Sequence, residues 1–223
     1  MSDDDKRFGY RVFLGFVVLV WLGIFIGFAL AADKPSPVVK ICLSYTCDSY
    51  GTAFHVGNGW FITAGHVAAG NVKKAYPKDS LGNKFTVETS WVAAQADISL
   101  FYSSVAANIM PAMPITCDSP KVGQAISITG NPYFLEHVTV SGSIISGPID
   151  IDELKQVYVA LIQVGPGGSG SPVMNSDGSA IGVLVAMIRG TTFALIEPIS
   201  KVCNILPRDL QEFRQAVSDR SGE

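Results

Sequence analysis

Clusters of basic residues are missing from this 223-residue chain, which has 16 basic and 19 acidic residues and a net charge of −3. Proteins that bind nucleic acid usually carry a basic patch or stripe, so we expect no nucleic-acid partner. The four cysteines include no Cys-x-x-Cys pair. Because that spacing is typical of dithiol redox motifs and zinc sites, its absence argues against both.

Helical periodicity is also scarce after residue 37, except at the C-terminus. Leu206, Leu210, Phe213 and Val217 recur at intervals of four, three and four residues, which places them on one face of a helix. Pro207 suits the first turn of such a helix, where a missing N–H costs little. We therefore predict a C-terminal helix that packs its apolar stripe on the preceding β structure.

Most of the chain shows short β-favouring runs separated by turn residues. Gly57-Asn58-Gly59 lies between two such runs and predicts a hairpin, and the segment from Asn175 to Gly178 predicts another turn. Roughly a dozen short strands at this spacing indicate an all-β barrel or sandwich. The predicted strands are 39–43, 51–56, 60–63, 85–87, 91–92, 97–102, 125–129, 138–145, 157–163, 172–175, 181–186 and 192–197.

Residues 12–32 form an apolar segment of 21 residues without a charge, long enough to span a bilayer as a helix. Lys6, Arg7 and Arg11 in the tail at 1–11 favour an inside N-terminus. A cleavable signal peptide that ends at Ala29-Leu30-Ala31 is the alternative. In both interpretations 33–37 is a linker, and the protein is membrane-anchored or exported with its folded part on the extracytoplasmic side.

All four cysteines lie in this exported part. Disulfides are therefore permitted, and four cysteines allow three pairings among which the sequence does not choose. Free buried thiols are the alternative. The cysteines are Cys42, Cys47, Cys117 and Cys203.

Three motifs carry candidate catalytic side chains. His66 closes the run Thr63-Ala64-Gly65-His66, Asp97 opens an apolar strand, and Ser169 lies in a run of glycines that ends at Pro172. A serine hydroxyl becomes a nucleophile when an imidazole takes its proton, and a carboxylate holds that imidazole in place. The spacing is 31 residues from His66 to Asp97 and 72 residues from Asp97 to Ser169.

The order and the local sequences of these motifs resemble the trypsin-like serine proteases, and among them the HtrA-type branch. The resemblance implies a protease domain at 38–206, made of two six-stranded antiparallel β-barrels at about 38–105 and 121–200, with a helix and tail at 207–223. HtrA-type enzymes usually carry a PDZ domain after the protease. Only 17 residues follow Leu206, so we expect this domain to be absent.

The resemblance also implies the role of each residue. Ser169 would attack a peptide bond, His66 would carry the proton, Asp97 would orient His66, and the backbone N–H groups of Gly167 and Ser169 would form the oxyanion hole. No metal or organic cofactor is needed for this chemistry. The other candidate histidines and aspartates lack comparable flanking residues; they are His55, His137, Asp79 and Asp118.

The nucleophile loop departs from the family pattern Gly-Asp/Asn-Ser-Gly-Gly-Pro at two positions. Gly168 replaces the Asp or Asn, and Ser171 replaces the second glycine. These departures support an alternative from another class, a catalytically inactive protease-like module that binds peptides at the membrane surface. An esterase is a third idea, but the chain lacks the alternating helices and strands of an α/β-hydrolase.

Substrate preference depends, by alignment with the family, on Gln163, Val164, Val185, Ala186 and Met187. None of these is acidic, so cleavage after Lys or Arg is not expected, and a small or medium aliphatic residue fits better. The expected partner is a polypeptide substrate. Because HtrA-type relatives are commonly trimers, a homo-oligomer is a further expectation.

Overall fold

The computed structural model describes residues 35–69, 76–93, 96–203 and 206. The predicted membrane segment 12–32 and the predicted C-terminal helix at 207–223 lie outside these residues, so both stay predictions. Within the described part, no helix combines the length and the apolar character needed to cross a bilayer.

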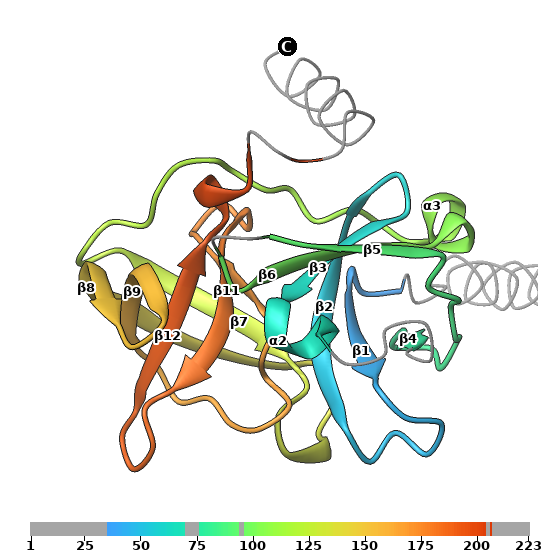
Figure 1. Ribbon diagram of the computed structural model, residues 1–223, viewed down its shortest axis with the longest axis horizontal. Helices are drawn as coiled ribbons and strands as arrows, with labels where there is room; N and C mark the ends of the chain where they lie inside the picture. Colours follow the sequence, from blue (N-terminus) through green and yellow to red (C-terminus); the bar gives the residue numbers. More distant parts are fainter. Residues whose placement is uncertain (1–34, 70–75, 94–95, 204–205, 207–223) are drawn as a thin grey trace, which may run out of the picture. The chain divides into compact units, whose positions relative to one another are not determined.

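The first half of the domain is a six-stranded antiparallel sheet in the order β4-β1-β2-β3-β6-β5 (Figure 1). The prediction of a closed first barrel is wrong for the described residues, because β4 and β5 lie at the two edges of this sheet. Neither edge strand is suited to pair with a further strand. Strand β4 contains Pro77, which has no N–H to donate to a neighbouring strand, and all of β5 is exposed. The strands are β1 Val38–Cys42, β2 Tyr50–Gly57, β3 Trp60–Ala64, β4 Tyr76–Lys78, β5 Thr89–Val92 and β6 Ile98–Tyr102.

The second half is a closed six-stranded barrel in the order β10-β11-β12-β9-β8-β7, as predicted. Strand β8 is longer than expected, because its pairing with β9 shifts register near Ser146 and Ile149 instead of ending there. The strands are β7 Ala125–Gly130, β8 Val138–Ile151, β9 Leu154–Leu161, β10 Pro172–Met174, β11 Ala180–Met187 and β12 Phe193–Pro198. Short helical segments are α2 Gly65–Ala68, α3 Ser104–Ile109, η2 Pro132–Phe134 and η3 Ile199–Lys201.

The predicted hairpin at Gly57-Asn58-Gly59 is confirmed. It joins β2 to β3, and all three residues have positive φ angles of 114°, 47° and 80°. His55, which is 1% exposed, secures this turn: its Nε2 accepts a hydrogen bond from the N–H of Gly59 at 3.1 Å, and its Nδ1 contacts the carbonyl of Pro111 at 2.9 Å. Since Nε2 accepts, Nδ1 carries the proton and the ring is neutral.

Aromatic side chains fill the core of the first sheet. Phe54, Phe61 and Phe101 are fully buried, and the rings of Phe61 and Phe101 stack with their centroids 4.8 Å apart. A second core cluster of Ile, Val and Leu side chains lies inside the closed barrel. Strands β2 and β11 bury runs of consecutive residues, so both faces of these strands are covered, in contrast to a sheet with one solvated face.

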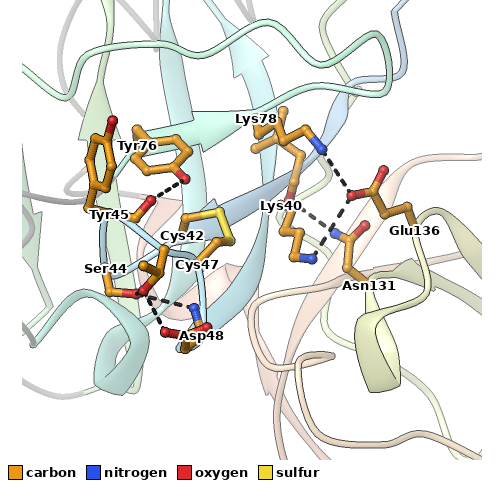
Figure 2. Close-up of a disulfide and its surroundings, with 12 residues drawn as sticks. Lys40, Cys42, Ser44, Tyr45, Cys47, Asp48, Tyr76, Lys78, Asn131 and Glu136 are labelled. Carbon is orange, nitrogen blue, oxygen red and sulfur yellow. Dashed lines mark hydrogen bonds and ion pairs between the residues drawn. A yellow bond between two sulfur atoms is a disulfide. The ribbon is translucent and has the colours of Figure 1, made fainter.

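The four cysteines form two disulfides. Cys42 pairs with Cys47 and closes a short loop after β1 (Figure 2), and Cys117 pairs with Cys203. The second pair joins segments that are 86 residues apart, so it removes more conformational entropy from the unfolded chain than the first. The alternative of free thiols is therefore wrong.

Side chains also connect the two halves of the domain. Glu136, which precedes β8, pairs with Lys78 of β4 at 3.3 Å and with Lys40 of β1 at 3.9 Å (Figure 2). The side-chain amide of Asn131, which follows β7, donates to the carbonyl of Val39 at 3.3 Å. These contacts fix the first sheet against the second barrel on the side of β1.

Candidate active site

His66 lies in α2, directly after β3. Gly65 comes before it and packs against Asp97: its N–H donates to the Asp97 carbonyl at 2.9 Å, and a Cβ at position 65 would lie 2.7 Å from Asp97 Oδ1. A side chain here would therefore collide with the carboxylate. The close approach of Asp97 is the reason that position 65 needs a glycine.

The carboxylate of Asp97 holds His66 through both of its oxygens. Oδ1 accepts the backbone N–H of His66 at 2.7 Å, and Oδ2 lies 2.7 Å from Nδ1 of the imidazole. The His66 side chain is 49% exposed and the Asp97 side chain 19%. In this geometry the Nδ1–H of His66 donates to the Asp97 carboxylate, which leaves Nε2 as a proton acceptor that solvent or substrate can reach.

The other candidate histidines and aspartates make structural contacts instead. His55 is fixed in the hairpin described above, and burial lowers its pKa. Burial lowers the pKa of His137 by more than the negative charges of Glu136 and Asp79 raise it. Asp79 is buried and accepts the backbone N–H groups of a tight turn, and Asp118 contacts Thr116. Among the described histidines, His66 alone contacts Asp97.

The loop that carries Ser169 begins with a tight turn. Gly168 donates its N–H to the carbonyl of Gly165 at 2.9 Å, Pro166 takes the second position of the turn, and Gly167 takes the third with φ +90°. This is the arrangement of a type II turn, which needs a positive φ at its third residue. A Cβ on Gly167 would also collide with the ring of Tyr50 and the carbonyl of Asn131.

Thr52 of β2 fixes this loop from the first sheet. Its N–H donates to the carbonyl of Ser169 at 2.8 Å, and its hydroxyl donates to the carbonyl of Gly167 at 2.9 Å. The same hydroxyl accepts the N–H of Asn131 at 3.1 Å. Thr52 is fully buried, so a side chain of the core connects this loop to β2.

The N–H groups of Gly167 and Ser169 in this loop have no acceptor in the described part. The Pro166 carbonyl accepts the N–H of Tyr133 at 2.8 Å. Because the C=O and N–H of a trans peptide point in opposite directions, this bond turns the N–H of Gly167 away from Tyr133. These are the two groups that the sequence analysis predicts for the oxyanion hole.

Packing accounts for both departures from the family pattern. The hydroxyl of Ser171 donates to the carbonyl of Gly168 at 2.6 Å, and it occupies the space that a Cβ on Gly130 would need. A Cβ at position 168 would lie 2.9 Å from the Gly165 carbonyl and 3.2 Å from a methyl group of Leu184. Ser171 is therefore matched by a glycine opposite it, and position 168 has little room for a side chain.

Gly51 lies between the backbone of Ser169 and the segment that carries His66. A Cβ at position 51 would lie 3.1 Å from the Ser169 carbonyl and 2.9 Å from a methyl group of Val67, the neighbour of His66. The Ser169 hydroxyl itself makes no hydrogen bond with another described residue. Catalytic hydrogen bonds are often long in unliganded enzymes and shorten with substrate.

A broad cleft contains His66 and Asp97. The residues predicted to set substrate preference do not all line this cleft. Ala186 and Met187 line it, whereas Gln163 and Val164 line a small separate cavity with Gly168. Val185 is buried in β11 and packs in the same core cluster as Phe54 and Phe61 of the first sheet. The cleft continues over the hairpin that joins β8 to β9.

The sequence analysis misses one side chain of this cleft, Glu197. It lies in β12, is 1% exposed, and accepts the backbone N–H of Asp97 at 3.3 Å. Burial raises its pKa, while the adjacent Lys201 lowers it. The available signal was a single carboxylate within the apolar run from Phe193 to Pro198. Within the described residues, no group of three or more His, Cys, Asp or Glu side chains is placed to hold a metal ion.

A family model described as a trypsin-like peptidase domain matches residues 51–183, which is more than half of the chain. The chain belongs to this family. A DegP-like periplasmic serine endoprotease of Halomonas elongata is 31% identical over 141 residues, which are 60% of this chain and 29% of the relative. The chain thus spans less than a third of that relative's length.

Solved structures show the same fold. The HtrA-type protease AlgW with a tripeptide has a TM-score of 0.68 at 17% identity and covers 78% of this chain and 60% of its own. A serine endoprotease from Yersinia pestis has a TM-score of 0.66 at 18% identity, with 82% and 66% covered. The predicted resemblance to trypsin-like proteases of the HtrA type is confirmed.

Proposed function

We propose that this chain is a serine endopeptidase that cleaves polypeptides through an acyl-enzyme, with His66, Asp97 and Ser169 as its catalytic residues. The observation that carries the proposal is the two-point contact of Asp97 with His66 beside an open cleft. It fixes the imidazole in the tautomer whose Nε2 is free to accept a proton. The family to which the chain belongs supports the same chemistry.

The reaction proceeds in two halves. Ser169 Oγ attacks the carbonyl carbon of the peptide bond while Nε2 of His66 takes its proton, and His66 then donates this proton to the leaving amine. In the second half, water attacks the acyl-enzyme, again with His66 as the base, and Ser169 is released. Asp97 stays ionised and stabilises the imidazolium that forms in each half.

The oxyanion is stabilised by the N–H groups of Gly167 and Ser169. Both lack an acceptor in the described part, and the bond from Tyr133 to Pro166 directs the first of them. Loss of one such donor typically raises the barrier by about 2.7–4 kcal/mol. Fixing the loop before substrate arrives means that these dipoles need no reorganisation during the reaction.

Substrate would lie along the cleft that His66 shares with Ala186 and Met187. The apolar surface of these two side chains supports a preference for a small or medium aliphatic residue before the cleaved bond. The preference for this substrate residue would also depend on the other predicted residues, which act through the segments that carry them. These residues are Gln163, Val164 and Val185. The chemistry requires no metal or organic cofactor.

Two observations support an exported protein. The Halomonas elongata relative is named as a periplasmic protease, and two disulfides such as those found here persist in oxidising compartments. Residues 12–32 would then serve as a membrane anchor or as a cleaved signal. Assembly into a homo-oligomer is part of the proposal and follows from the HtrA-type resemblance alone.

Hydrolysis of casein by the full chain in detergent tests the proposal. We expect Ser169→Ala to lower the rate by roughly 10⁴-fold or more, whereas Ser176→Ala, in an exposed turn, leaves it unchanged. Equal hydrolysis by the wild type and Ser169→Ala would contradict the assignment of the nucleophile. Peptide binding without hydrolysis by either protein would favour the inactive binding module, whose sequence support is weakened by the packing of Gly168 and Ser171.

A further inference from the structure

Glu197 is a buried carboxylate that the proposed mechanism does not use. Its Oε1 accepts two hydrogen bonds, from the Asp97 N–H at 3.3 Å and from Lys201 Nζ at 2.8 Å. Its Oε2 is buried and has no hydrogen-bond partner among the described residues. Because burying a carboxylate is costly, an incompletely satisfied one needs an explanation.

The contact joins Asp97 to the opposite half of the domain. The other hydrogen bonds of Asp97 come from its own side, where Gly65 and His66 donate to its carbonyl and carboxylate. Glu197 belongs to β12 of the closed barrel and provides the one hydrogen bond between Asp97 and that barrel within the described part. It therefore fixes the Asp97 backbone from the side that the first sheet does not reach.

Lys201 completes this arrangement. Its ammonium lies on Glu197 Oε1 and also donates to the carbonyl of Lys155 in β9, and the Lys201 side chain is only 17% exposed. Burial and the negative charge of Asp97 raise the pKa of Glu197, whereas Lys201 and the Asp97 N–H lower it. The cation is thus the group that favours a charged Glu197 next to a second carboxylate.

We infer that Glu197, paired with Lys201, is a positioning residue that holds Asp97 in place from the second barrel so that both carboxylate oxygens meet His66. This inference rests on the function proposed above. Glu197 touches neither the imidazole nor the reacting atoms, so it acts through Asp97. It connects the two halves of the domain at His66 and Asp97, in contrast to the Glu136 contacts, which connect them at β1 and β4.

The test separates activity from stability. Apolar replacement of a buried ion pair is often neutral or stabilising, so the double variant Glu197→Leu, Lys201→Met is expected to remain as stable as the wild type. Its kcat should nevertheless fall by about 10–100-fold with little change in KM, since small displacements of catalytic groups have effects of this size. Glu197→Gln keeps an oxygen acceptor for the Asp97 N–H and should restore most of the kcat.

Glu136→Leu is the matched control, because it removes another carboxylate that connects the two halves of the domain and should leave kcat near the wild-type value. A double variant with wild-type kcat, or a control with an equal loss, would overturn the inference. If the double variant does not fold, Lys201→Met alone removes the cation beside Glu197 and should lower kcat in the same direction, with an unchanged kcat as the contrary result.

A second readout does not depend on hydrolysis. The downfield NMR resonance of the His66 Nδ1 proton reports its hydrogen bond to Asp97, and we expect it to shift or broaden in the double variant but not in Glu136→Leu. An unchanged resonance would contradict the positioning role. A wild type without hydrolytic activity would refute the proposed function, and this resonance would then decide the role of Glu197 by itself.

Discussion

Gly65→Ala is the sharpest single perturbation of the contact between His66 and Asp97. The added methyl would lie 2.7 Å from Asp97 Oδ1 and 3.2 Å from the Asp97 carbonyl carbon. The carboxylate cannot simply move aside, because both of its oxygens are engaged by His66. We expect the methyl to displace Asp97 and to weaken at least one charge-assisted hydrogen bond, each worth about 1.5–3 kcal/mol.

Two measurements give this prediction its magnitude. Overpacking of this kind typically costs about 1–3 kcal/mol of unfolding free energy, which urea denaturation measures. A catalytic misplacement of about 1 Å can lower the rate by about 10²-fold, which peptide hydrolysis measures. The expected signature of Gly65→Ala is a large loss of kcat that the modest loss of folded protein does not explain.

Gly178→Ala is the matched control. Gly178 has a positive φ of 78° and open space around its would-be Cβ, so alanine there costs about 1–2 kcal/mol through the backbone alone. We expect stability to fall and kcat to stay at the wild-type level. Wild-type kcat in Gly65→Ala would refute the view that contact between positions 65 and 97 sets the geometry of His66.

Two further variants test the loop and the pH dependence. Thr52→Val keeps the shape of a buried side chain but leaves the Gly167 carbonyl without the hydroxyl donor. The rate of acylation by a fluorophosphonate should therefore fall by about 10-fold, and the free energy of unfolding by about 1–3 kcal/mol. An unchanged acylation rate would contradict the role of Thr52. Burial lowers the pKa of His55 from its ordinary value of 6.5, so the unfolded chain binds more protons than the folded one below that value. Stability should therefore decline as pH falls below 6.5, by at most about 1.4 kcal/mol per pH unit, and urea denaturation of His55→Gln should show a flatter profile; an equal slope in both proteins would rule out His55 as the source.

Local turn chemistry made much of the fold predictable. Gly57-Asn58-Gly59 has few alternatives to a hairpin, and its three positive φ angles match that prediction. The spacing of the strands indicated only an all-β barrel or sandwich, and the closed second barrel was an implication of the resemblance to trypsin-like proteases. The open first sheet was not predicted, because its edges depend on Pro77 and on the exposure of β5, and neither alters the alternating pattern from which strands are predicted.

The site was predictable where its residues share a local motif and not where they meet through folding. His66, Asp97 and the glycine-rich loop each have a recognisable flanking sequence. Glu197 and Thr52 lie in strands and contact the site only because the two halves of the domain come together. A lone carboxylate in an apolar strand was visible in the sequence, but nothing there indicated which residue it would face.

The most direct test of the central claim is peptide mapping by mass spectrometry after the full chain reacts with a fluorophosphonate. We expect a single covalent adduct on Ser169, formed rapidly in the wild type and more than about 10³-fold more slowly after His66→Ala. Modification at another residue, or equal rates for the two proteins, would contradict it.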